Sequence, residues 1–227
     1  VKYNVKPDKK VSIIIPTRDA VELVEQCVST VEKFTAYPNY EIVIVDNGST
    51  DEQTLDYLTR KSAESTSFKS LKYDHRFNFS ELNNYAVQQT DSPYLLFLNN
   101  DIEVTSKGWL TAMLEHAQRD DVGAVGAKLL YPDGRIQHAG VILGMGGIAG
   151  HPFKELPEHN GVYFGHSNLV KNYSAVTAAC LLMRREVFED IGGYNEELAV
   201  SFGDIDLCLE IVKRGYRIIY TPYSRLI

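Results

Sequence analysis

Along the first half of the chain, short apolar runs alternate with segments whose apolar residues recur every three or four positions. Uninterrupted runs of this length predict buried strands, and the wider spacing predicts amphipathic helices. The predicted strands are Val11–Ile15, closed by Pro16, then Tyr40–Val45, Tyr94–Leu98 and Val122–Ala127; the predicted helices are 20–34, 51–62, one from Ser80 and one over 109–117. Strands alternating with helices predict an α/β fold with a mostly parallel central sheet and helices on both faces.

The pattern changes from 128 to 175, where Gly, Pro, His and Asn are frequent and helical spacing is absent. We interpret this segment as a loop-rich, acceptor-side part of the same domain. After it, the pattern predicts a strand at Val176–Met183, helices at 185–191 and 204–214, and a last strand at Tyr216–Tyr220. Residues 1–10 are polar and predict an N-terminal arm or linker before a single domain at 11–227.

The overall charge narrows the possible functions. The 227 residues carry 23 basic and 30 acidic side chains, a net charge of −7, which argues against a dedicated nucleic-acid binder. No apolar run approaches the ~20 residues of a membrane span, and the first residues lack the pattern of a signal peptide. The three cysteines are far apart in apolar runs, which predicts buried thiols and fits a reducing cytoplasm.

Several common motifs are absent or out of place. Residues 144–149 fit the spacing of a dinucleotide-binding glycine motif, but Pro152 disfavours the helix that such a motif requires. Neither a P-loop nor a Gly-x-Ser-x-Gly elbow occurs. His138, His151, His159 and His166 show no tight ligand spacing and are interpreted as polar loop residues rather than metal ligands.

Acidic residues at the ends of predicted strands are the candidates for chemistry, because ligands bind beyond the carboxyl ends of parallel strands. Asp101, after the third strand, is a hard oxygen ligand suited to Mg²⁺ or Mn²⁺, or else part of a turn. Asp46 either accepts a hydrogen bond from a base or caps the next helix. Asp204 and Asp206 begin a helix, so they either stabilise its N-terminus or provide a general base.

The order and spacing of these segments resemble the family 2 inverting glycosyltransferases of GT-A fold. The resemblance is carried by Val11–Thr17, Ile42–Asp51, Leu95–Ile102 and Phe202–Tyr220. It is strengthened by Gly192–Glu196, and the segment at 173–180 is similar to bacterial members that build cell-surface polysaccharides.

On the donor side, the resemblance implies that Pro16, Thr17 and Asp46 border the nucleoside. It also implies that Arg76 and Asn78 lie in a second nucleotide-contacting segment.

Around the diphosphate and the acceptor, the resemblance implies a different set of roles. Asn100 and Asp101 correspond to an Asp-x-Asp motif, in which Asp101 is the metal ligand and Asn100 contacts the nucleotide. Asp204 corresponds to the catalytic base, with Asn99 and Asp206 in supporting roles. The chain departs from the family pattern where Asn99 and Asn100 replace acids, and where Gly203 replaces a Glu before the base.

The implied activity is inverting, metal-dependent transfer from a UDP- or dTDP-sugar to a hydroxyl of a glycan or lipid-linked acceptor. Mn²⁺ or Mg²⁺ is the implied cofactor, and the loop at 144–168 is expected to form an acceptor lid. The implied location is the cytoplasm, at the inner face of the membrane, with membrane contact through regions outside this chain. Family members usually continue to a metal- or diphosphate-binding histidine, so the chain is expected to be truncated after Ile227.

Two alternatives stay open at this point. A nucleotidyltransferase shares the architecture, but the Thr17–Ala20 segment has no glycine-rich phosphate loop. A non-catalytic sugar-nucleotide or glycan-binding module with a decayed site would fit Asn99, Asn100 and Gly203.

Overall fold

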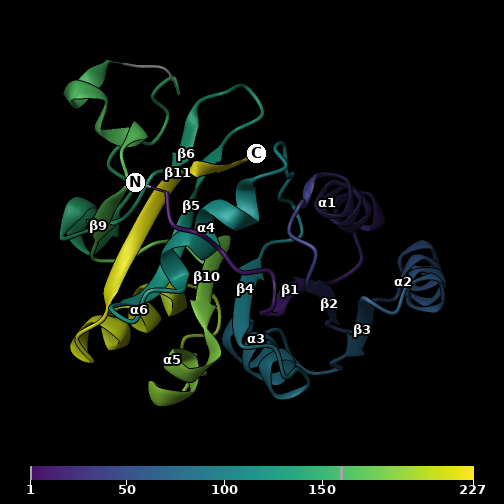
Figure 1. The fold of residues 1–227 in the computed structure, drawn as a ribbon. Coiled ribbons are helices and arrows are strands. Elements are labelled where there is room, and N and C mark those ends of the chain that lie inside the picture. The colour runs from purple at the N-terminus through teal and green to yellow at the C-terminus, as the bar shows by residue number, and fades with distance from the viewer. Residues whose placement is uncertain (1, 159–160) are drawn as a thin grey trace.

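A mixed β-sheet forms the centre of the protein in a computed structural model that describes residues 2–158 and 161–227 (Figure 1). In the described residues its strand order is β3-β2-β1-β4-β10-β5-β11-β9, with β6 paired to β5. The strands of this sheet are β1 (Val11–Thr17), β2 (Tyr40–Asp46), β3 (Phe68–Lys72), β4 (Tyr94–Leu98), β5 (Val122–Leu130), β6 (Ile136–His138), β9 (Lys171–Tyr173), β10 (Cys180–Arg184) and β11 (Arg217–Leu226). A separate two-stranded pair joins β7 (Ile142–Leu143) to β8 (Ala149–Gly150).

Helices cover both faces of this sheet. They are α1 (Val21–Phe34), α2 (Glu52–Glu64), α3 (Phe79–Gln88), α4 (Trp109–Ala117), α5 (Arg185–Asp190) and α6 (Gly203–Lys213), with 3-10 turns at Met145–Gly147 and Val162–Asn168. Apolar residues of α1, α2 and α4 belong to one core cluster, and those of α3, α5 and α6 belong to the other. The predicted α/β architecture with helices on both faces is therefore confirmed.

Strand direction determines which residues meet at the edge of the sheet. β3, β2, β1 and β4 are mutually parallel, whereas β10 is antiparallel to both β4 and β5. β5 and its parallel neighbour β11 therefore run in the same direction as β1. As a result, the carboxyl ends of β1, β2 and β4 share one edge with the residues that precede β10.

Strands β10, β3 and β11 differ from the predictions, and the short strands β6, β7, β8 and β9 lie in the segment that was expected to be loop-rich. β10 begins at Cys180 instead of Val176, because its pairing with β4 begins where Cys180 meets Leu98, at the end of β4. β3 was not predicted, since its sequence FKSLK carries too few apolar residues to stand out from a loop. β11 runs on to Leu226, past a register shift between Thr221 and Arg225 that pattern reading does not detect.

The segment at 128–175 contributes to the second core cluster. β5 extends into it as far as Leu130, and Ile136, Val141 and Phe153 are buried together with Ala175. The N-terminal segment also contacts the sheet domain, because the Tyr37 hydroxyl donates hydrogen bonds to the carbonyls of Lys6 and Lys9.

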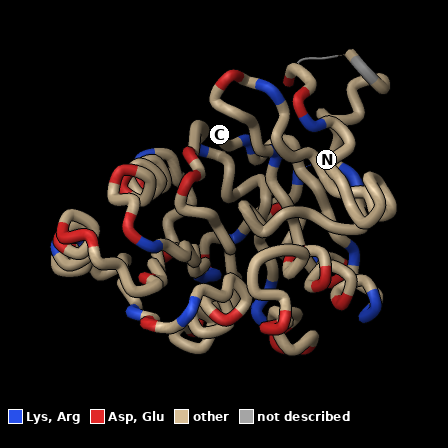
Figure 2. Tube along the Cα trace, turned by 180° about the vertical axis from the view of Figure 1, so that it is seen from behind, with Lys and Arg blue, Asp and Glu red and all other residues tan. Residues whose placement is uncertain are grey.

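Charge is spread over the outside of the molecule. Figure 2 shows acidic and basic positions around the whole outline of the fold, with neither sign gathered on one side. The net charge of −7 thus forms no single acidic face in this view. Among the described residues, no helix combines the length and apolar character needed to span a bilayer.

Gly126 on β5 allows the segment before β10 to pack closely against the sheet. A Cβ at this position would lie 2.5 Å from Cβ of Val176 and 2.7 Å from its Cγ1. Only glycine fits without a shift of one backbone, and that shift would displace the residues that follow Val176.

We predict that Gly126→Ala lowers the free energy of unfolding by about 1–3 kcal/mol through overpacking. The measurement is the urea midpoint followed by circular dichroism. Gly108→Ala is the matched control, because nothing lies within 4 Å of its added Cβ. Equal midpoints for Gly126→Ala and the control would contradict this role of Gly126.

Candidate active site

The ends of three parallel strands bring together the residues expected on the donor side. Thr17 ends β1 and lies opposite Asp46, which ends β2. The Asn100 side-chain amide, in the turn after β4, donates a 2.9 Å hydrogen bond to Thr17 Oγ1. Thr17 and Asp46 are both buried. Three predicted site residues, separated by up to 83 positions in sequence, are therefore contiguous in space.

Asp46 also organises its own turn. Its Oδ1 accepts a 2.9 Å hydrogen bond from the Ser49 backbone N–H. The alternative that Asp46 caps the next helix is wrong, because the N-cap of α2 is Asp51, whose carboxylate accepts from the Thr54 N–H. The contact of Asp46 with a base stays a prediction. Pro16 is half-buried within β1, opposite Val45.

Asp19 is a residue of this region that sequence reasoning missed. Its Oδ1 accepts hydrogen bonds from the backbone N–H groups of Thr50 (2.8 Å) and Asp51 (2.9 Å), which join the loop after β1 to the loop after β2. These two hydrogen bonds hold the pKa of the Asp19 carboxyl below its ordinary value. Asp19 has φ 52°, a left-handed conformation that aspartate tolerates better than most residues.

Asn47 joins the loop after β2 to the loop after β3. Its amide nitrogen donates to the carbonyls of Tyr73 and His75. Its Oδ1 is buried without a hydrogen-bond partner among the described residues. An orphaned buried acceptor at this edge can accept a hydrogen bond from a ligand.

The loop between β3 and α3 holds the remaining donor-side candidates. Asn78 caps α3: its Oδ1 accepts from the N–H groups of Ser80 and Glu81, and its Nδ2 donates to the Glu196 carbonyl and to the Glu81 carboxylate. The amide of Asn78 is thus engaged in folding. Arg76 is exposed and forms no ion pair with any described residue. The nucleotide-contacting roles of both residues stay predictions.

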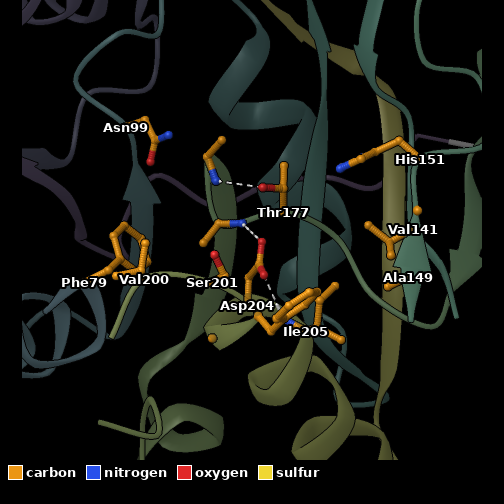
Figure 3. Close-up of a pocket in the computed structure, with 15 residues that line it drawn as sticks. Phe79, Asn99, Val141, Ala149, His151, Thr177, Val200, Ser201, Asp204 and Ile205 are labelled. Carbon is orange, nitrogen blue, oxygen red and sulfur yellow. Dashed lines mark hydrogen bonds between the residues drawn. The ribbon is translucent and has the colours of Figure 1, made fainter. Parts of the chain in front are cut away.

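The predicted base, Asp204, is held at the start of α6. Its Oδ2 accepts a 3.2 Å hydrogen bond from the Ala178 backbone N–H, and its Oδ1 accepts one of 2.9 Å from the N–H of Ile205 (Figure 3). The segment with Ala178 is in turn joined to the end of β4, because the Asn99 N–H donates to the Ala179 carbonyl at 3.1 Å. Asn99 thus supports the segment that fixes Asp204.

Two adjacent cavities open at this edge. The first, of about 360 Å³, is lined by Asp204 and by residues of the 141–151 and 200–205 segments. The second, of about 250 Å³, is lined by Asp101 and Lys154. Both cavities share Asn99, His151, Thr177 and Ala179.

Two predicted residues lie differently with respect to these cavities. Asp101 is exposed, lines the second cavity and forms no ion pair with any described residue. Asp206 lies in the first turn of α6 but is not among the residues that line either cavity.

Among the described histidines, His138 differs from its interpretation as a polar loop residue. His138 is buried on β6, and its Nδ1 lies 2.9 Å from Nδ1 of His151, which lines both cavities. The sequence pattern did not predict the buried position of His138, because β6 (Ile136–His138) has only three residues and is too short to show a strand pattern. His166 is exposed, and His159 lies outside the described residues.

Asp101 stays the predicted ligand for a divalent metal. In the described part of the chain, no three His, Cys, Asp or Glu side chains gather in a way that would hold a metal ion. A metal at Asp101 therefore fits only if substrate or water oxygens complete its coordination, as is usual for Mg²⁺ and similar ions bound with phosphates.

Comparison with known proteins shows which family the chain belongs to. The profile described as Glycosyl transferase family 2 matches residues 12–192. The chain belongs to this glycosyltransferase family.

Two relatives share more than 40% identity with this glycosyltransferase domain. It is 46% identical over 217 residues to the uncharacterized protein y4gI of Sinorhizobium fredii. This match covers 95% of this chain and 24% of that protein. It is 43% identical over 228 residues to the O-antigen biosynthesis protein RfbC of Myxococcus xanthus. This match covers 100% of this chain and 18% of that protein. The chain thus spans a quarter or less of the length of these relatives.

Solved structures share the fold. A mannosyltransferase from Pyrobaculum calidifontis, in complex with GDP-Man and Mn²⁺, matches with a TM-score of 0.73 and 18% identity, over 99% of this chain and 58% of that chain. GalNAc-T7 with UDP, GalNAc and Mn²⁺ matches with a TM-score of 0.79 and 16% identity, over 96% of this chain and 43% of that chain. The expected GT-A fold and family are confirmed, and the nucleotidyltransferase alternative is not supported.

We predict that Asp19→Ala removes protection from hydrogen exchange at the Thr50 and Asp51 amides, because the acceptor of both N–H groups is lost. In the unaltered chain the carboxylate form makes these bonds, so protection is present above its lowered pKa and declines as pH falls through that pKa. Exchange followed by NMR against pH measures both effects.

Asp133→Ala is the matched control, since Asp133 also accepts a backbone hydrogen bond in a turn, from Arg135. Unchanged exchange at Thr50 and Asp51 in Asp19→Ala would show that these amides are protected by other contacts.

Proposed function

We propose that this domain transfers a sugar from a nucleotide-diphosphate sugar, most simply a UDP- or dTDP-sugar, to an acceptor hydroxyl with inversion at the anomeric carbon. The observation that carries the proposal is the position of Asp204. Its carboxylate is fixed by two backbone N–H groups in a cavity that adjoins the cavity of Asp101. Donor-side residues from β1 and β2 lie at the same edge of the sheet.

In the proposed mechanism, Thr17 and Asp46 hold the nucleoside at the ends of β1 and β2. Asp101 would hold a divalent metal, Mn²⁺ or Mg²⁺, which would supply positive charge to the leaving diphosphate. Each carboxylate oxygen of Asp204 accepts one hydrogen bond from a backbone N–H and has a second lone pair available as an acceptor. Asp204 can therefore take the proton of an acceptor hydroxyl as that oxygen attacks from the face opposite the diphosphate.

The comparisons support the donor class and the metal. The similar mannosyltransferase was solved with GDP-Man and Mn²⁺, and GalNAc-T7 was solved with UDP, GalNAc and Mn²⁺. Similarity to an O-antigen biosynthesis protein favours a role in cell-surface polysaccharide synthesis. The proposed acceptor is accordingly a glycan or lipid-linked hydroxyl, used at the inner face of the membrane.

The rim of the Asp204 cavity suits a bulky acceptor. Val200 and Phe202 line it and are 74% and 46% exposed. Ile148, 63% exposed, lies in the segment proposed as an acceptor lid. Exposed apolar side chains around a polar cavity favour contact with the faces of sugar rings or with a lipid carrier.

We predict that Asp204→Asn lowers kcat for sugar transfer by about 10²–10⁴-fold, since an amide cannot take the proton. Nucleotide affinity should stay within about twofold, because Asp204 lies in the first cavity and not at the ends of β1 and β2. The assay is product formation with a panel of UDP-, dTDP- and GDP-sugars, with calorimetry for the nucleotide.

Glu210→Gln is the matched control, because Glu210 lies on the same helix and pairs with Lys213. Near-full transfer by Asp204→Asn would place the base elsewhere. Binding without transfer by the unaltered chain would favour the non-catalytic binding module.

We predict that Asp101→Ala weakens Mn²⁺-dependent nucleotide binding by roughly tenfold or more, because the charged protein ligand is lost. Titration calorimetry of UDP with and without Mn²⁺ measures this. Asp56→Ala, at an exposed position on α2, should leave the affinity unchanged. The metal role of Asp101 is refuted if both variants bind alike with Mn²⁺ present.

A further inference from the structure

A pair of histidines connects the sheet to the rim of the candidate active site. His138 on β6 is buried, with 1% of its surface exposed, and its Nδ1 lies 2.9 Å from Nδ1 of His151. The His138 Nε2 accepts a 3.3 Å hydrogen bond from the Gly140 backbone N–H. The two rings meet edge to face, with centroids 5.0 Å apart.

These contacts determine where the protons are. A backbone N–H donates only to an unprotonated ring nitrogen, so Nε2 of His138 carries no proton and Nδ1 does. Burial holds the pKa of His138 well below its ordinary value, which keeps this ring neutral. Nδ1–H of His138 therefore donates to Nδ1 of His151, and a neutral His151 must carry its own proton on Nε2.

The free edge of His151 faces the space where the two cavities meet. His151 lines both cavities, and its Nε2 forms no hydrogen bond with another described residue. In Figure 3 its side chain extends toward the space in front of Thr177, with a ring nitrogen at the leading end. Asp204 lies on one side of this space and Asp101 lines the cavity on the other side.

The position of His151 between the two cavities indicates what its Nε2–H contacts. Under the proposed function, on which this inference rests, the diphosphate lies on the Asp101 side and the acceptor hydroxyl at Asp204. The transferred sugar must then lie between the two cavities, against the residues that line both. We propose that His151, fixed by His138 as an Nε2–H donor, donates a hydrogen bond to a ring hydroxyl of the transferred sugar and so helps to determine which sugar is accepted.

The same proton positions disfavour a metal-ligand role for His151. A metal binds an unprotonated ring nitrogen, whereas Nδ1 of His151 faces His138 and its Nε2 carries the proton. Ligation through Nε2 would require the proton to leave, and Nδ1 cannot take it while His138 donates there. The arrangement suits recognition of a neutral oxygen, and a sugar hydroxyl is such an oxygen.

The first test is the tautomer itself, measured without substrate by nitrogen-15 NMR of the imidazole rings. His151 should be protonated on Nε2 and His138 on Nδ1. In His138→Phe, checked for folding by circular dichroism, His151 should become a mixture of tautomers. A proton on Nδ1 of His151 in the unaltered chain would overturn the inference, whatever the behaviour of His138→Phe.

The second test locates the hydroxyl with donor analogues. The unaltered chain, His151→Phe and the control Glu210→Gln, which lies outside both cavities, are titrated by calorimetry with UDP-glucose, UDP-GalNAc, GDP-mannose and dTDP-rhamnose. The tightest sugar is then tested in forms that each lack one ring hydroxyl. Loss of one particular hydroxyl should weaken binding to the unaltered chain and the control by roughly fivefold to tenfold, the value of one hydrogen bond.

In His151→Phe, loss of that same hydroxyl should cause no further weakening. Equal sensitivity to every hydroxyl in the variant and the unaltered chain would overturn the inference, even if transfer is intact. Because these are binding measurements, they decide the role of His151 even if the chain binds sugars without transferring them, which would refute only the proposed transfer. If none of the four nucleotide sugars binds, both proposals are overturned.

Discussion

The antiparallel strand β10, inserted between β4 and β5, is the constraint on which the site depends. An antiparallel strand brings its amino end to the edge where its parallel neighbours have their carboxyl ends. The residues just before β10 therefore lie beside the turn after β4, and the hydrogen bond from Asn99 to Ala179 joins them. Without this reversal, the Ala178 N–H that holds Asp204 would lie at the opposite edge.

Packing and hydrogen bonding then fix the components that this edge brings together. Close contact between Gly126 and Val176 positions the segment before β10, while Asp19 joins the two loops on the donor side. The Gly126 contact is made by packing and the Asp19 contacts by backbone N–H groups, so neither requires a bound substrate. Preorganised groups of this kind avoid reorganisation during reaction, which is a large part of what an active site supplies.

The sequence predicted the elements with strong apolar patterns and the acidic residues at strand ends. The βαβ order, the sheet and the positions of Asp46 and Asp101 follow from spacing alone, because a parallel sheet collects its strand ends at one edge. The polar edge strand β3 and the start of β10 could not be predicted from the spacing, since both depend on pairing with distant strands. The contact between Asp204 and Ala178 and the buried position of His138 also depend on tertiary packing.

The proposed mechanism places Asp101 and Asp204 on opposite sides of one bound nucleotide sugar. It is tested most directly by a crystal structure of the domain with UDP and Mn²⁺, with anomalous data collected at the manganese edge. The proposed mechanism predicts a manganese peak beside Asp101, the uracil near Asp46, and the diphosphate directed toward Asp204. UDP bound at the opposite edge of the sheet, or manganese bound away from Asp101, would contradict it.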